Sequence, residues 1–129
     1  MSFTNYLETA VLNHVFRNTA LPVVSTLRVG LFTAAPTDST AGTEVTGGGY
    51  TRQTMTFGAP TQVGEDAVIT NTSAATFQRT GTPVNVVAVG FFDAATAGNL
   101  LAYGAISPSA LGDGEEVQIP AGQLTVSQR

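Results

Sequence analysis

The segment that most constrains the fold is VNVVAVGFF at residues 84–92, which is apolar almost without interruption. A strand with this composition is buried on both faces, as central strands of a sheet are. It is followed by a turn-forming stretch, DAATAGN at 93–99, and then by a second apolar stretch, LLAYGAI at 100–106. The pattern predicts an antiparallel hairpin whose first strand lies inside a sheet.

Further strands are predicted from alternation of apolar and other residues, starting with LRVGLF at 27–32 and YTRQTMTF at 50–57. Two stretches are predicted to be loops, a long one at 35–49 and a turn-rich one at 107–114. Glycine and proline separate the remaining short strands, predicted at 61–63, 67–71, 75–78, 117–119 and 124–126. This spacing is typical of an all-β fold, here an antiparallel β-sandwich over residues 25–126, either jelly-roll or immunoglobulin-like.

An N-terminal helix is predicted over residues 1–19, because apolar residues follow a 3.6-residue period. Ser2 or Thr4 can cap its start. Leu12 and Phe16 lie beside the main stripe and form a second apolar edge that a partner chain can cover. We expect the main stripe to pack on the sandwich, with His14 partly buried at the junction; the stripe comprises Phe3, Leu7, Ala10, Val11, His14 and Val15.

Composition restricts the class of protein. The length of 129 residues fits one domain over residues 1–129. The absence of cysteine excludes disulfides and thiolate metal sites. The net charge is −4, and the five basic residues, all arginines, form no basic run, which argues against nucleic-acid partners. No apolar stretch approaches the ~20 residues of a membrane helix, and no signal peptide is recognisable, so we expect a soluble protein without membrane partners.

Candidate chemistry is sparse, and we expect no catalytic residues, cofactor or metal. His14 is the single histidine. The acids of GDGEE at 112–116 and the pair Glu65–Asp66 do not have the spacing of an EF-hand loop. The glycines at 47–49 are followed by a tyrosine and a strand pattern rather than by the lysine of a phosphate-binding loop, so they indicate a flexible hinge.

Three stretches resemble a known family. They are the opening segment MSFTNYLETAVLNHVFRNTA, the phrases GLFTAAPTD and GTEVTGGGYTRQ, and the late hairpin GFFDAATAGNLLAYG. In this order, from Ser2 to about Ile106, they resemble small tailed-phage virion proteins that are often labelled tail-fibre-like, some of which look like capsid decoration proteins.

The resemblance implies a non-enzymatic virion component, most simply a decoration (cement) protein on the outer capsid surface that stabilises the assembled shell. Its expected partners are the major capsid protein and further copies of itself, as a dimer or trimer, and its place of synthesis is the bacterial host cytoplasm. The alternative is a structural or host-recognition module of a tail fibre or baseplate.

Candidate partner contacts come from the helix edge, the long loop with the strand after it, and the C-terminus. A decoration protein needs segments of this kind to reach a neighbouring subunit. The residues expected to contact partners are Leu12, Phe16, Thr37, Asp38, Glu44, Val45, Tyr50, Arg52 and Arg129.

Overall fold

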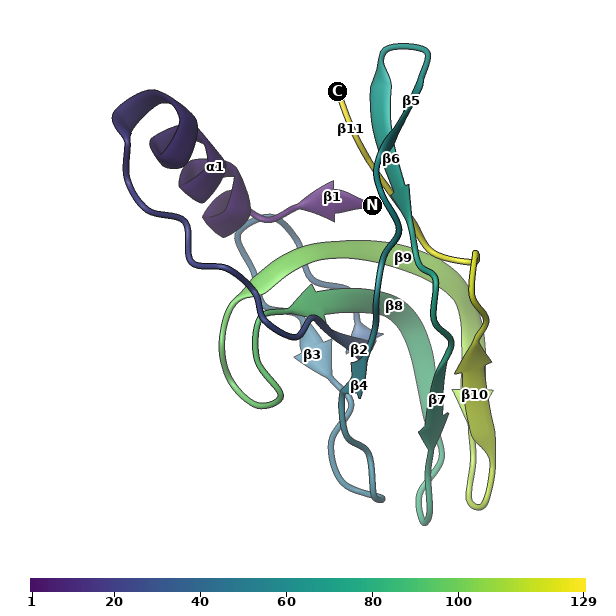
Figure 1. The fold of residues 1–129 in the computed structure, drawn as a ribbon. Helices are drawn as coiled ribbons and strands as arrows, with labels where there is room; N and C mark the ends of the chain where they lie inside the picture. Colours follow the sequence, from purple (N-terminus) through teal and green to yellow (C-terminus); the bar gives the residue numbers. More distant parts are fainter.

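The computed structural model describes all of residues 1–129 and is built from one helix and eleven strands (Figure 1). The helix α1 spans Asn5–Arg17. The strands are β1 (Ser2–Phe3), β2 (Arg28–Ala34), β3 (Thr43–Glu44), β4 (Gln53–Thr54), β5 (Thr61–Val63), β6 (Asp66–Thr70), β7 (Ala75–Gln78), β8 (Val84–Phe92), β9 (Leu100–Leu111), β10 (Glu116–Ile119) and β11 (Thr125–Gln128).

The main sheet has the order β1-β9-β8-β2-β3, with β4 also paired to β2. The predicted hairpin is confirmed, since β8 and β9 pair antiparallel and β8 lies between β9 and β2. In the second half of β8, residues 88–92 are all buried. The apolar run therefore has the double-sided burial that its composition predicted.

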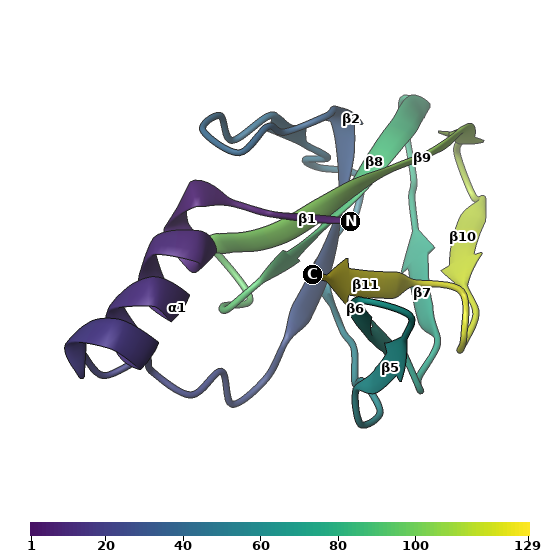
Figure 2. The same ribbon diagram turned by 90° about the horizontal axis from the view of Figure 1, so that it is seen from above.

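Two smaller antiparallel sheets, β10-β7 and β11-β6-β5, face the main sheet and complete the predicted sandwich (Figures 1 and 2). The core between the layers contains thirteen buried residues. The largest fully buried side chains are Phe32, Phe77, Leu31, Leu111, Val29, Val86 and Val89. Phe32 belongs to a second, small cluster with Ala88 and Phe92, on the other face of the main sheet.

One predicted loop is wrong in its first half. The turn-rich stretch at 107–114 is strand as far as Leu111, because β9 continues past Pro108. Pairing shifts register between Val86↔Ser109 and Ala88↔Ala105, so β9 carries a bulge there. Proline is tolerated at a bulge or sheet edge, where its missing N–H removes no ladder bond, and Pro108 therefore does not end the strand.

The predicted strand at 50–57 is also corrected. Only β4 is strand within it, and Phe57 forms an isolated bridge with Asn71 beside β6. The segment crosses from the main sheet to the sheet that contains β6, so it cannot pair continuously with either. The long loop at 35–49 is shorter than expected, because β3 lies inside it and Val45 N–H donates to the carbonyl of Leu31 (2.9 Å).

The helix lies at the edge of the sandwich rather than across it (Figure 2). It begins at Asn5, after the Thr4 cap, and ends at Arg17, where Asn18 adopts a left-handed conformation (φ 55°). The predicted start at residue 1 is wrong, because Ser2 and Phe3 pair with β9 as strand β1 and cannot also be helical. With 13 residues it is the only helix, and no helix in the structure is long and apolar enough to cross a membrane.

Candidate assembly surface

The root of α1 is firmly attached to the main sheet. Thr4 is 5% exposed, and its hydroxyl donates to the carbonyl of Leu100 (2.7 Å) and accepts from the N–H of Leu7 as the helix cap. Its own N–H donates to the carbonyl of Leu101 (2.9 Å). The carbonyl of Asp38 accepts from the N–H of Asn5 (3.0 Å). The first turn is therefore fixed by β9 and by the loop at 35–42.

Beyond its first turn α1 is poorly packed, and none of its residues is buried. Leu7, Ala10 and Val11 are half-buried against the rest of the molecule. His14 is exposed, and its Nδ1 lies 3.1 Å from the carbonyl oxygen of Thr19, so the expected partial burial of His14 at the sandwich is wrong. Val15 is also exposed, because the helix leaves the sheet edge before this point.

The outward side of α1 carries three large apolar side chains. Leu12, Val15 and Phe16 are 58%, 64% and 78% exposed. At 100° per residue Leu12 and Phe16 project away from half-buried Leu7, whereas Val15 lies at the side of the packing stripe and is exposed because α1 has left the sheet edge at this point. We call these three residues the α1 face. An amphipathic helix normally directs such residues to a core, and here none of the molecule's own core is within their reach.

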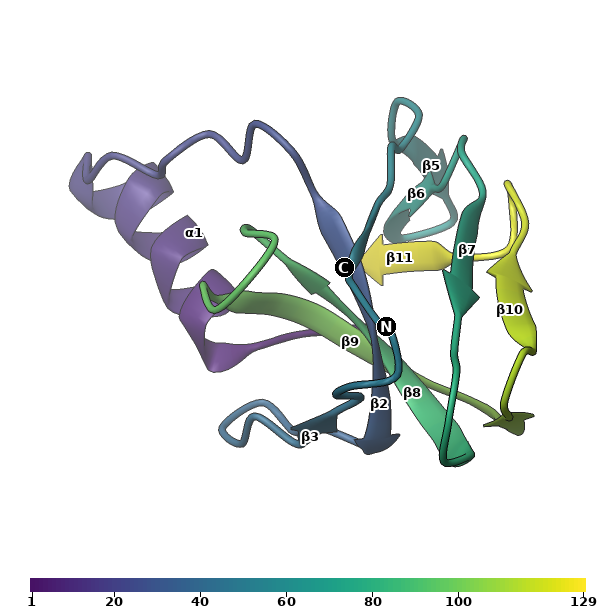
Figure 3. The same ribbon diagram turned by 90° about the horizontal axis from the view of Figure 1, so that it is seen from below.

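The segment that links α1 to β2 adds to this exposed apolar surface. Leu21 is half-buried and lies beside α1, whereas Val23 is 92% exposed. Figure 3 shows α1 and this linker as an arm beside the sandwich, attached at its two ends. We call residues 4–27 the arm.

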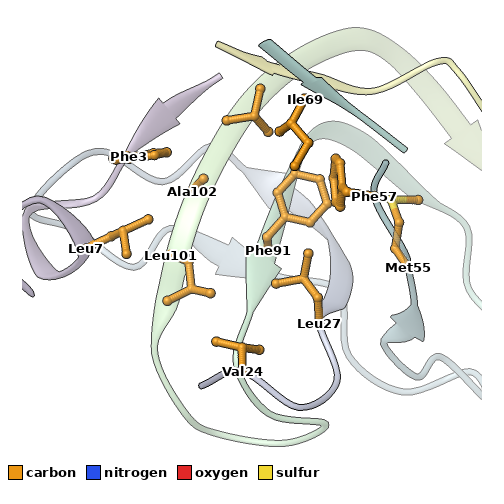
Figure 4. A pocket seen from close by; sticks show the side chains of 11 residues that line it. Phe3, Leu7, Val24, Leu27, Met55, Phe57, Ile69, Phe91, Leu101 and Ala102 are labelled. Carbon is orange, nitrogen blue, oxygen red and sulfur yellow. The ribbon is translucent and has the colours of Figure 1, made fainter. Parts of the chain in front are cut away.

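An apolar groove lies between the arm and the sandwich, with a volume of about 410 Å³ (Figure 4). Phe57 and Phe91 meet edge-to-face at its centre, with ring centroids 5.3 Å apart. All eleven residues that line the groove are hydrophobic: Phe3, Leu7, Val24, Leu27, Met55, Phe57, Ile69, Phe91, Leu101, Ala102 and Val126. The groove has no charged or hydrogen-bonding side chain.

Three of the expected contact residues, Glu44, Tyr50 and Arg52, bind one another. Arg52 donates through Nε and Nη2 to the two carboxylate oxygens of Glu44, both at 2.8 Å. Tyr50 donates its hydroxyl to the same carboxylate (2.9 Å) and accepts from the N–H of Leu31 (2.9 Å). The guanidinium carbon of Arg52 lies 3.4 Å from the ring centroid of Phe92. We call these residues the Arg52 cluster.

The Arg52 cluster closes the outer face of the main sheet. Arg52 also donates to the carbonyls of Ala94 (3.0 Å) and Ala97 (2.8 Å) and so holds the β8–β9 turn. Burial raises the pKa of Tyr50, and the carboxylate of Glu44 raises it further, so the hydroxyl stays protonated and keeps its donor role. Gly30 leaves room for the cluster, because a Cβ there would lie 2.9 Å from both the Glu44 carboxylate and the Tyr50 hydroxyl.

A second arginine site fixes the end of the sandwich opposite the arm. Arg79 is 7% exposed and donates to the carbonyls of Thr82 (2.5 Å), Thr46 (3.2 Å) and Gly47 (3.3 Å). None of the molecule's three ion pairs includes Arg79, so carbonyl dipoles alone compensate its charge. Gly48 has a φ of 60°, and a Cβ there would lie 2.6 Å from the Thr80 carbonyl. The glycines predicted as a hinge thus form a hydrogen-bonded turn.

The remaining expected contacts lie apart from one another. Thr37 bonds to Thr40 within its own turn, and Asp38 accepts from the hydroxyl of Tyr103, whose pKa this hydrogen bond raises. Val45 is in the core, 2% exposed. Arg129 pairs with Glu65 and Asp66 at 3.5 and 3.0 Å. Among the expected contact residues, Leu12 and Phe16 are thus the two whose side chains are large, apolar and exposed.

Sequence reasoning missed the groove and the role of Val15. The groove is assembled from seven separate parts of the chain, and no local pattern predicts such a site. Val15 had the correct period for the packing stripe, and only the position at which α1 leaves the sheet shows that it is exposed. No group of three or more histidine, cysteine, aspartate or glutamate residues is arranged to bind a metal ion.

Comparison with known proteins assigns the family. The model of the family described as Podophage GP4 fiber I protein gp80 matches residues 2–127, almost the whole chain. No curated protein matches the chain. The matched range includes α1, the arm and every strand of the sandwich except the last residue of β11. The chain therefore belongs to the Podophage GP4 fiber I protein gp80 family of phage virion structural proteins.

Proposed function

We propose that this chain is a non-enzymatic structural component of a phage tail fibre, which assembles with neighbouring virion subunits through its arm. The family description supports the fibre assignment. The observation that carries the mode of action is the α1 face, on which Leu12, Val15 and Phe16 are all more than half exposed. Contiguous exposed apolar surface of this kind marks an interaction site.

The division of the molecule into a rigid body and an arm suits this role. When a partner covers the α1 face, each Å² of apolar surface removed from water contributes about 25 cal/mol of binding free energy. The hydrophobic effect therefore drives the contact. Repeated copies in one particle add avidity, and each single contact can then be weak. The sandwich is the rigid part, because hydrogen bonds from Arg52 and Arg79 fix the turns at its edges.

The direct test is the position and copy number of the chain in purified virions, by electron cryomicroscopy and quantitative gel analysis. A tail-fibre component is expected in a few copies at the tail. Density for the sandwich at the tail, with the α1 face against another subunit, is the expected result. A chain absent from virions, or one whose α1 face is solvated in the particle, contradicts the proposal.

A second candidate is the capsid decoration role, with the major capsid protein as partner. One observation favours it: residues 1–129 fold as one sandwich with no internal repeat, whereas a fibre shaft is built from repeated units. A decoration protein shifts the assembly equilibrium toward the intact shell because it binds the shell better than free subunits. Hundreds of copies on the head, and few at the tail, would establish this role instead.

A further inference from the structure

We propose that the occupant of the apolar groove is the α1 face of a second copy of this chain. Copies then associate by placing the α1 face of one chain in the groove of the other. The inference rests on the proposed function, because it names the partner that covers the α1 face, the surface on which that function depends. Leu12, Val15 and Phe16 of one copy cover the groove around Phe57 and Phe91 of its neighbour.

The chemistry of the groove selects this kind of occupant. Small-molecule sites combine apolar walls with a few polar groups that orient the ligand. All eleven lining residues here are hydrophobic, so a polar ligand has no partner in the groove. A volume of about 410 Å³ accommodates several protein side chains, and the α1 face offers three that are apolar and already exposed.

Charge also permits a second copy at this place. Each chain has a net charge of −4, which disfavours self-association through most surfaces. The groove has no charged residue, and α1 carries one glutamate and one arginine, Glu8 and Arg17, whose formal charges cancel. The arm and the groove are thus surfaces through which two acidic chains can meet without direct charge repulsion.

Area distinguishes insertion into the groove from simple helix pairing. A stable interface of standard size buries about 800 Å² per partner, from roughly 20–30 residues a side. Two α1 faces against each other would use only three large side chains from each copy. Insertion uses the α1 face together with the seven groove residues that are not already buried, and Val23, which is 92% exposed, lies beside them. A contact in which each copy both gives its face and receives its neighbour's therefore covers more apolar surface than pairing of two helices.

Two substitutions test the two halves of the contact by sedimentation of the purified chain over a range of concentrations. Phe16→Asp places a charge on the α1 face, and Val24→Asp places one at the groove, where Val24 is 38% exposed. Each is expected to weaken self-association about tenfold or more, because a desolvated anchor is lost. The matched control is Val63→Asp, since Val63 is an apolar residue 62% exposed on β5 and belongs to neither surface. Circular dichroism verifies the fold of all three variants.

Cysteine trapping tests the geometry, because the chain has no cysteine of its own. Chains with Phe16→Cys and with Val24→Cys are mixed and oxidised, and the expected product is the mixed dimer linked between positions 16 and 24. A Val63→Cys chain should not cross-link to either. If only the symmetric dimer linked through position 16 forms, helices pair with helices and the groove is not the receptor.

The outcomes separate this inference from the proposed function. A wild-type chain that remains monomeric at every concentration, or that associates unchanged with Phe16→Asp, overturns the inference. If the chain is monomeric and Phe16→Asp still prevents incorporation into virions, another virion protein covers the α1 face and the proposed function stands. If the chain associates as predicted but is absent from virions, the inference stands and the proposed function fails.

Discussion

The two ends of the molecule handle their exposed segments in opposite ways. At one end, Arg79 is buried and hydrogen-bonded to three carbonyls, and the turns around it are held to one another. At the other end, the arm is attached only at its two ends, its helix buries no residue, and a groove of about 410 Å³ remains beside it. A chain of this size can bury its polar loops and still leave a large apolar helix face uncovered. This difference is the basis of the proposal that the end with the arm carries out assembly and that the end with Arg79 serves as scaffold.

The largest expected difference between sandwich and arm is in how much the substitution of one phenylalanine lowers the free energy of unfolding. Phe77 is 1% exposed and stacks on Tyr50, whereas Phe16 is 78% exposed. Phe77→Ala should lower the free energy of unfolding by about 3–5 kcal/mol, because it removes buried area and leaves a cavity. Phe16→Ala should change it by less than about 0.5 kcal/mol. Urea denaturation measures both, and similar losses in the two variants would show that α1 packs on the core in solution.

The Arg52 cluster should show the next largest effect. Arg52→Met keeps the length of the side chain but leaves the Glu44 carboxylate, whose side chain is only 23% exposed, without its cationic partner. A loss of about 2–4 kcal/mol is expected, because half of a largely buried ion pair remains. The double variant Arg52→Met/Glu44→Gln should recover part of that loss. A double variant as unstable as the sum of the two single changes would argue against coupling through this pair.

Alkaline pH should weaken the sandwich through Tyr50. The chain has no lysine and no cysteine, so tyrosines are the side chains that titrate above roughly pH 9. The pKa of Tyr50 is raised on folding, so its contribution to stability is full below the unfolded pKa of about 10 and is lost as pH rises through the folded pKa.

Ionisation of Tyr50 is expected to lower the free energy of unfolding by at most about 1.4 kcal/mol per pH unit. Tyr50→Phe should make the stability curve above pH 10 less steep, and the exposed Tyr6→Phe should leave it as in the wild type. An identical slope in Tyr50→Phe would mean that another group responds to alkali.

The smallest of these effects should be local to the arm. Thr4→Ala removes the helix cap and the hydroxyl bond to the Leu100 carbonyl, at a cost of about 1 kcal/mol. Limited proteolysis within residues 5–27 should become faster, whereas hydrogen exchange in β8 should not change, because the core does not depend on α1. Faster exchange throughout β8 would show that arm and sandwich unfold together.

The sandwich could be predicted from sequence because its signals are local. The apolar run of β8, the turn after it and the strand β9 follow one another along the chain, and β5 and β7 were predicted at their observed bounds. The misplaced elements depend on distant partners. Pro108 by itself predicts a turn, and only the bulge in β9 allows a strand to continue through it. The alternation around Tyr50 and Arg52 predicts a strand, whereas in the structure both side chains bind Glu44.

The candidate assembly surface was predictable only in part. Leu12 and Phe16 stood out because they lie off the packing stripe, and they are indeed exposed. Tyr50, Arg52 and Glu44 looked equally suitable, and only the three-dimensional structure shows that they satisfy one another. The groove had no sequence signal, since Phe57, Phe91 and Val126 come from separate strands or connections and meet only in the folded chain.

The attachment of the arm also defines how the molecule bears force. Tension applied to α1 reaches the sandwich through Thr4 and β1, which pairs antiparallel with β9 at Ser2↔Tyr103 and Phe3↔Ala102. From β9 the load spreads into β8, the most deeply buried strand of the main sheet. A pull along β1 shears several hydrogen bonds at once rather than opening them one after another. The weakly packed arm is thus anchored to the most deeply buried sheet of the fold, so tension on the arm reaches the core through paired strands rather than through a loop.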